Sequence, residues 1–221
     1  MLRMHGFTER ERIMLVALRM TAEAVIQEMT RHPSLPDWVF PPPRGFVAED
    51  LDHIPDLPAH TELIDGSLVF VSPHGSFHMR VASLLESELR RAAPKDFRVR
   101  RDMSVILRPR QRPEPDVMVI KAEAVRDDDE TFYEARDVVL VIEVVSPASE
   151  VRDRERKPQL YAEAAIQHLW RIEKNAGKPV VYVYELDPAS KTYVITGIQR
   201  DFLKASVPFD LAVDLTEVDQ L

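Results

Sequence analysis

A single carboxylate interrupts the most apolar stretch of the chain. Residues 138–145 are aliphatic except for Glu143. A continuous apolar run that ends at a turn signal, here Ser146-Pro147, is typical of a strand buried on both faces. An ionised carboxylate in such a strand costs several kcal/mol unless a cation or strong hydrogen bonds meet it. Glu143 therefore needs a partner, unless it lies at a solvated strand end or pairs with an arginine for structural reasons.

A lysine and a tyrosine follow this run at a spacing that suits one face of a helix. Lys157 is followed by Pro158, a residue favoured in the first turn of a helix. Tyr161 lies four residues after Lys157, so the two side chains would share a helix face. We expect Lys157 to reach Glu143, and Tyr161 either to hydrogen-bond at the same site or to pack with its hydroxyl at the rim.

A second carboxylate, Asp116, follows Pro115 and opens the short apolar run 116–120. If the two runs form neighbouring strands, Asp116 and Glu143 converge at one sheet edge. Two carboxylates held together repel, so each needs a cation. Mg²⁺ suits such a place because it prefers oxygen ligands and is often held by one or two carboxylates beside substrate phosphates. A metal there would activate water, and Lys157 could orient or deprotonate that water or stabilise the transition state.

Composition limits the other possibilities. The 221 residues suffice for one domain with a sizeable core. The absence of cysteine excludes disulfides, thiolate metal sites and cysteine nucleophiles. No apolar run approaches the roughly 18 residues of a membrane span, and the run 13–18 is short for a signal peptide. We therefore expect a cytoplasmic protein without a membrane partner.

The net charge of −8 argues against a nucleic-acid partner, but the charges are segregated. Residues 78–112, here called the basic strip, hold ten Lys or Arg and four Asp or Glu, a balance of 10 − 4 = +6. Such a strip can bind phosphates on an acidic protein, or it can be a solvated face. Arg100 and Arg101 are its candidate substrate contacts. His78 could contact phosphate, act as an acid near neutral pH, or make a structural hydrogen bond.

The N-terminal part differs from the rest. A capping-box spacing from Thr8 to Glu11 predicts a helix over residues 8–30, and Met20 is an alternative translation start that would leave residues 1–19 untranslated. Residues 33–43 form a proline-rich linker. We therefore expect an N-terminal extension over residues 1–46 and a compact domain over residues 47–221.

Within that domain the pattern predicts a mixed α+β fold of the α/β type, with a β-sheet flanked by helices. Two apolar runs joined across Asp65-Gly66 predict a hairpin over residues 62–71, and an apolar stripe predicts a helix over residues 76–93. The remaining expected elements are a short helix within 46–54, one bent or two short strands over 97–107, strands at 116–120, 138–145, 169–172, 180–186 and 192–196, a helix over 157–165, and an edge strand within 207–215.

The ordered set of motifs resembles the Uma-two endonucleases of the PD-(D/E)XK superfamily, which have the restriction-endonuclease-like fold. The matching stretches are Glu62-Leu-Ile-Asp-Gly, Ser72-Pro73 followed by His78, Pro115-Asp116, the segment IEVVSP around Glu143, and Asp153 to Lys157 with Leu160-Tyr161-Ala162. Together they span about residues 47–215. The resemblance implies Asp116 and Glu143 as ligands of Mg²⁺ or Mn²⁺, helped by the backbone carbonyl of Val144, and Glu62 as an additional metal or water ligand. Glu62 could equally be an exposed strand-start glutamate.

The chain departs from the superfamily pattern at one position. In (D/E)XK the lysine lies two residues after the acid, and Val145 stands there. Strand alternation would place Val145 on the same face as Glu143. The resemblance implies that the following helix supplies the lysine instead, as Lys157.

These observations lead to a metal-dependent endonuclease that hydrolyses DNA phosphodiesters, with Asp116, Glu143, Lys157 and Glu62 as its catalytic set. A homodimer would suit the cutting of both strands of a duplex. The alternatives are a non-catalytic nucleic-acid-binding module that keeps the nuclease fold, and a regulatory protein without a nucleic-acid partner. Binding to DNA that depends on salt but not on Mg²⁺ would identify the module, and no salt-sensitive binding would identify the regulator.

Overall fold

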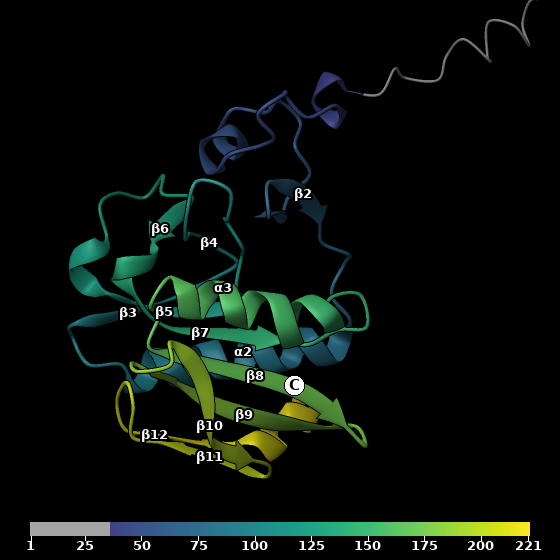
Figure 1. Ribbon diagram of the computed structural model, residues 1–221. Coiled ribbons are helices and arrows are strands. Elements are labelled where there is room, and N and C mark those ends of the chain that lie inside the picture. Colours follow the sequence, from purple (N-terminus) through teal and green to yellow (C-terminus); the bar gives the residue numbers. More distant parts are fainter. Residues whose placement is uncertain (1–35) are drawn as a thin grey trace, which may run out of the picture. The chain divides into compact units, whose positions relative to one another are not determined.

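The computed structural model describes residues 36–221 (Figure 1). The predicted helix over residues 8–30 and the alternative start at Met20 lie outside the described residues. The chain divides into two compact units, Met1–Pro41 and Pro42–Leu221. In the first unit, the described residues contain one short 3-10 helix, η1 (Asp37–Val39). In the second unit Phe46 and Ala48 are already buried, and the boundary expected between residues 46 and 47 stays a prediction.

The second unit begins with a 3-10 helix and the predicted hairpin. The helix η2 (Ala48–Asp52) occupies the expected place, and β1 (Thr61–Ile64) pairs with β2 (Ser67–Phe70). Ile64 pairs directly with Ser67, so Asp65-Gly66 forms a two-residue turn. Both turn residues have positive φ, 53° and 78°, which the primed turns of tight hairpins require and which Asp-Gly tolerates. All four β1 residues are buried, including Glu62.

Six strands form the central mixed sheet in the order β10-β9-β8-β7-β5-β3. Only β7 and β8 are parallel neighbours in this sheet, and its other pairs are antiparallel. The pair β5 and β7 confirms that the runs after Asp116 and around Glu143 are neighbours. The strand bounds are β3 (Phe97–Arg101), β5 (Val117–Lys121), β7 (Val138–Val144), β8 (His168–Asn175), β9 (Lys178–Asp187) and β10 (Thr192–Gln199).

Strand alternation divides the core between the two faces of the sheet. On one face, Val117, Leu140 and Ile142 pack with the apolar side of α2 (Ser76–Ala92). On the other, Met118 and Val141 pack with residues of α3 (Lys157–Glu163) and of the segment after it. Figure 1 shows the two helices on opposite sides of the sheet. The buried strand β7 therefore lies in the middle layer, as its continuous apolar run predicted.

The helix that carries Lys157 begins earlier than expected. A π-helical turn, η5 (Arg152–Arg156), leads directly into α3, and the Lys157 N–H donates to the carbonyl of Arg152, five residues back. Pro158 explains this irregularity, because it has no N–H to donate and its ring crowds the carbonyl four residues before it. One wider turn accommodates both defects within a continuous helical segment.

Of the two alternatives for residues 97–107, the structure has the two short strands, whereas the edge strand expected within 207–215 is corrected. Residues 97–107 form two strands in different sheets, since the chain turns at Asp102, where φ is 52°. The second strand, β4 (Ser104–Ile106), pairs in parallel with β6 (Phe132–Glu134). The strand within 207–215, β12 (Leu211–Asp214), is not an edge of the central sheet but pairs with β11 (Phe202–Ala205). The inward residues of this hairpin, such as Leu203 and Val213, join the core on the α2 face, so the hairpin covers that core instead of extending the ladder.

Short 3-10 helices complete the fold, η3 (Ala122–Ala124), η4 (Ala135–Asp137) and η6 (Leu215–Gln220). Among the described residues, no helix is long and apolar enough to cross a membrane.

Candidate active site

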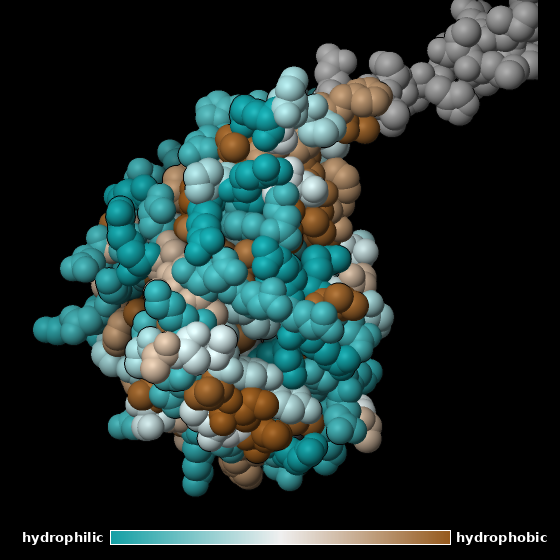
Figure 2. All heavy atoms as spheres, viewed as in Figure 1, coloured by the Kyte–Doolittle hydropathy of each residue, from teal (hydrophilic) through white to brown (hydrophobic). Residues whose placement is uncertain are grey.

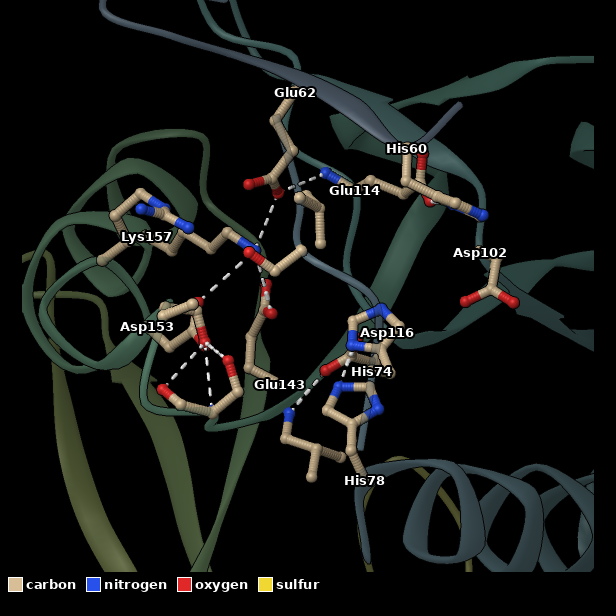
Figure 3. Close-up of a pocket in the computed structure, with 17 residues that line it drawn as sticks. His60, Glu62, His74, His78, Asp102, Glu114, Asp116, Glu143, Asp153 and Lys157 are labelled. Atoms are coloured by element: carbon tan, nitrogen blue, oxygen red, sulfur yellow. Dashed lines mark hydrogen bonds and ion pairs between the residues drawn. The ribbon is translucent and has the colours of Figure 1, made fainter. Parts of the chain in front are cut away.

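The two predicted carboxylates lie at the ends of adjacent strands. Val117 of β5 pairs with Ile142 of β7, which sets Asp116 opposite Glu143. The Asp116 carboxylate accepts a 2.6 Å hydrogen bond from the backbone N–H of Val144. Both acidic side chains are buried and line one cavity, here called the catalytic cavity (Figure 3).

Lys157 contacts three buried carboxylates. Its Nζ lies 2.8 Å from Glu62 Oε1, 3.0 Å from Glu143 Oε2 and 3.5 Å from Asp153 Oδ1 (Figure 3). The hairpin supplies Glu62, β7 supplies Glu143, and the π-helical turn supplies Asp153. The lysine therefore joins three elements that are distant in sequence, and the expectation of an exposed Glu62 is not met because that side chain is buried.

The charge balance around Lys157 shifts several pKa values. Burial raises the pKa of Glu143 well above its usual range. The positive charge of Lys157 lowers this pKa, whereas Asp153 and the other nearby acids raise it further. Burial alone would lower the pKa of Lys157, but Glu143, Glu62 and Asp153 together raise it well above its usual range. Burial also raises the pKa of Asp153. Three carboxylates around one ammonium thus leave an excess of negative charge that a further cation would offset.

Tyr161 completes the contacts of Glu143. Its hydroxyl donates a 2.6 Å hydrogen bond to Glu143 Oε1, from the same helix face as Lys157. Burial and the neighbouring Glu143 raise the pKa of Tyr161 well above its usual range, so it remains a hydrogen-bond donor at neutral pH. The i, i+4 spacing of Lys157 and Tyr161 therefore does place both on one carboxylate.

A histidine pair lies on the other side of Asp116. His78, from the first turn of α2, places Nε2 3.0 Å from Asp116 Oδ1. The ring of His74 stacks on that of His78 with centroids 3.8 Å apart and an interplanar angle of 11°. Ligand atoms of His74, His78 and Asp116 all lie within 4.8 Å of one another. Burial, followed by the neighbouring His78, lowers the pKa of His74, which favours the neutral ring that can bind a metal.

The donor set around the cavity fits a divalent cation. The cavity has a volume of about 30 Å³, more than the 10–15 Å³ that one water needs. Carboxylates of Glu62, Asp116, Glu143 and Asp153 line it. Carboxylate oxygens suit Mg²⁺ and Mn²⁺, whereas imidazole nitrogens suit transition metals such as Zn²⁺. A cation bound there would offset the repulsion among these carboxylates.

Of four other positions considered from the sequence, only Val144 lies at the catalytic cavity. The backbone of Val144 lies at the cavity, where its N–H binds Asp116. Val145, the first residue after β7, does not line the catalytic cavity. Arg100 donates to the hydroxyl of Tyr133, and Arg101 lies 3.2 Å from Asp102, so neither is among the side chains that line the cavity.

Asp153 and His74 also lie at the site, and neither had a role predicted from the sequence. Asp153 lies four residues before Lys157, a spacing that pairs opposite charges on a helix. That signal was present in the sequence, although the intervening turn is π-helical. His74 lies four residues before His78, but it precedes the helix that contains His78. No helical spacing rule could have placed their rings together.

The fold and the site together define the class of protein, a restriction-endonuclease-like nuclease fold with a mixed six-stranded sheet. The fold is similar to that in the crystal structure of "a putative nuclease belonging to DUF820 from Anabaena variabilis ATCC 29413", with a TM-score of 0.54 at 14% identity over 80% of this chain and 93% of that chain. NucC of P. aeruginosa ATCC27853, in its cAAA-bound form, matches with a TM-score of 0.32 at 12% identity over 57% of this chain and 85% of that chain, too weakly to bear on the fold. A comparison with curated proteins gave no match.

The sequence places the chain more narrowly. The model of the family Uma2, described as "Putative restriction endonuclease", matches residues 48–216. The chain belongs to the Uma2 family. This confirms the resemblance predicted from the ordered motifs around Asp116, Glu143 and Lys157.

Proposed function

We propose that this protein is a divalent-metal-dependent endonuclease that hydrolyses phosphodiester bonds of DNA. The observation that carries the proposal is the meeting of Glu62, Glu143 and Asp153 around one lysine, at a cavity that Asp116 also lines. Burying such a charge excess costs several kcal/mol and adds nothing that apolar packing could not supply. A site that must hold a cation and a phosphate accounts for that cost. Membership of a nuclease family supports the same reaction class.

In this proposal Asp116, Glu143 and the carbonyl of Val144 hold Mg²⁺ or Mn²⁺, with Glu62 beside them as a ligand of metal or water. The bound metal would lower the pKa of its water and neutralise charge that develops on the phosphate. His78, and His74 stacked on it, border the Asp116 side of the cavity and would favour Mn²⁺ over Mg²⁺.

Lys157 acts as a fixed cation. Its raised pKa keeps it protonated while the three carboxylates surround it, so it orients the attacking water or stabilises the transition state and does not remove a proton. Tyr161 holds Glu143 in place through its hydroxyl. Of the roles open to the lysine from sequence, the electrostatics thus favour positioning over general-base catalysis.

One observation favours the second candidate, a non-catalytic module. Both oxygens of Glu143 already have partners, Lys157 and Tyr161, and both oxygens of Asp116 bind Val144 N–H and His78. A network satisfied in this way could persist without a metal. Such a protein would bind DNA equally with and without Mg²⁺ and would cleave none.

Plasmid cleavage with Mg²⁺ or Mn²⁺ separates the two candidates. Wild type should nick or linearise plasmid, whereas Asp116→Ala and Glu143→Ala should remain folded and lose cleavage by at least about a hundredfold. Glu163→Gln, which changes an exposed glutamate on α3, is the control and should cleave as wild type does. Unchanged cleavage by either alanine variant would refute the assignment. The predicted homodimer is part of the proposal and is checked by light scattering on the same samples.

A further inference from the structure

A second cavity, here called the flanking cavity, lies beside the catalytic cavity and has a volume of about 550 Å³. The two cavities share His78 and Ser146. The start of α2, the turn after β7 and the end of β8 supply the walls, so the same elements that position Asp116 and Glu143 also build this space. Its volume falls within the range of about 300–1,000 Å³ that is typical of small-ligand sites.

The walls combine apolar surface with cations. Phe77 is half-buried, and Nζ of Lys174 lies 5.3 Å from its ring centroid. Arg80 supplies a second cation, and one of its guanidinium nitrogens also donates to the carbonyl of Val218. The third, Arg154, is already held by Glu150 and Glu173, which also line the cavity. The chemistry therefore suits a ligand with a flat apolar body and a negative charge.

Val145, which stands where the (D/E)XK pattern has its lysine, lies in the wall of this cavity. The residue two positions after Glu143 lines the flanking cavity together with Pro147, not the catalytic one. A lysine at position 145 would add charge to the apolar wall. With Lys157 supplied from the helix, position 145 is free to be apolar and to shape this wall.

We propose that the flanking cavity binds an unpaired nucleotide of the substrate strand, next to the phosphate at the catalytic cavity. This inference rests on the proposed nuclease function. The base would pack against the ring of Phe77 and take the place of the Lys174 ammonium there. Lys174 and Arg80 would then both pair with the phosphate of that nucleotide. A base can enter only after it leaves the stack of a duplex, which costs a few kcal/mol. Single-stranded or distorted DNA is therefore the favoured substrate class.

Binding without metal tests this proposal separately from cleavage. Fluorescence anisotropy in EDTA would compare a labelled oligothymidylate with a duplex of equal length. Phe77→Leu keeps apolar packing and removes the aromatic face, and Lys174→Gln removes the cation. Each should weaken single-strand binding at least about fivefold, the lower limit for the loss of one stacked base. The controls are Phe202→Leu and Lys191→Gln, which change exposed residues on β11 and on the turn after β9.

The outcomes distinguish the two proposals. Wild type should bind the single strand more tightly than the duplex, and only the two cavity variants should lose this preference while their urea unfolding stays close to that of wild type. Tighter binding of wild type to duplex, or unchanged single-strand binding by both folded variants, would overturn the cavity proposal. The nuclease proposal would still stand in that case if wild type cleaves plasmid. No binding and no cleavage by wild type would overturn both.

Discussion

Lys157 lies between three buried carboxylates, and this arrangement has consequences for stability as well as for chemistry. The ammonium cannot neutralise Glu62, Glu143 and Asp153 together. Without a metal, the folded protein therefore holds protons on Glu143 and Asp153 more tightly than the unfolded chain does. The clearest of these acids is Glu143, whose pKa is raised well above 4.5.

This predicts a pH dependence of the metal-free protein. Because the folded pKa of Glu143 lies above its unfolded value, its contribution is fully present below about pH 4.5 and is lost as the pH rises through the folded pKa. Lys157 and Tyr161, also raised, lose their contributions only above their ordinary values of 10.5 and 10.0. As the pH rises above about 4.5 toward the folded pKa of Glu143, the free energy of unfolding should therefore fall, by up to about 1.4 kcal/mol per pH unit for each proton.

Urea unfolding in EDTA at several pH values measures this slope. Glu143→Gln should flatten it, whereas Glu163→Gln, which changes an exposed side chain, should not. A slope in Glu143→Gln equal to that of wild type would show that Glu143 is not the titrating group.

Individual residues of the site were predictable where they stood out against their surroundings. Glu143 was conspicuous in an apolar strand, and the i, i+4 spacing paired Lys157 with Tyr161. His74 was not predictable, because its contact with His78 depends on the path of the chain before α2. The partners of Glu62 likewise depend on how the hairpin lies against the helix.

At the scale of elements, the π-helical turn before α3 sets the position of Lys157. It results from Pro158, which cannot donate to the carbonyl of Arg154. The wider turn changes the direction in which Asp153 and Lys157 face the cavity. Irregular turns of this kind are frequent at functional sites.

Pro158→Ala should restore a regular α-helical bond and displace Lys157 from Glu143. We expect a folded protein of equal or higher thermal stability with cleavage reduced about tenfold or more, because a displacement of about 1 Å can cost a hundredfold in rate. Circular dichroism and plasmid cleavage measure the two effects. Full activity in a well-folded variant would show that the turn does not position the lysine.

Most elements followed from local patterns, and the failures have a common cause. Asp65-Gly66, the apolar stripe of α2 and the buried runs of β5 and β7 are local signals. The pairing of β4 with β6, and of β12 with β11 instead of the central sheet, depends on contacts between distant segments. The π-helical turn was missed because Pro158 suits the start of a helix as well as an irregularity within one.

At the scale of the whole molecule, the basic strip is not one surface. Arg112 is buried and holds Asp52 through two hydrogen bonds of 2.6 Å and 2.8 Å. It also donates to Ser104 and to the carbonyl of Ala48. Arg112 thus ties η2 to β4 and has a structural role that its position in a charged sequence concealed.

Arg112→Met should lower the free energy of unfolding by about 1.5–3 kcal/mol, because it removes the charged donor that binds Ser104 and the carbonyl of Ala48. Arg91→Met, which removes an exposed arginine of the same strip, should change it by less than about 1 kcal/mol. Urea denaturation measures both. Similar losses in the two variants would contradict the structural role of Arg112.

The surface also shows where apolar residues gather. Figure 2 shows an apolar patch in the region of β10, an edge strand of the central sheet, where Val194, Ile195 and Ile198 are exposed. Neither this patch nor the buried state of Arg112 followed from net charge or composition. The patch depends on which face of β10 the completed fold leaves open, and the burial of Arg112 depends on how η2 packs against it.

The most direct measurement is a calorimetric titration of Mn²⁺ into wild type and Glu143→Gln, with plasmid cleavage on the same samples. If Glu143 is a working metal ligand, wild type binds Mn²⁺ and cleaves, and the variant loses at least about tenfold in affinity together with its cleavage. Equal Mn²⁺ binding by the two proteins, or cleavage by the variant at the wild-type rate, would contradict the account.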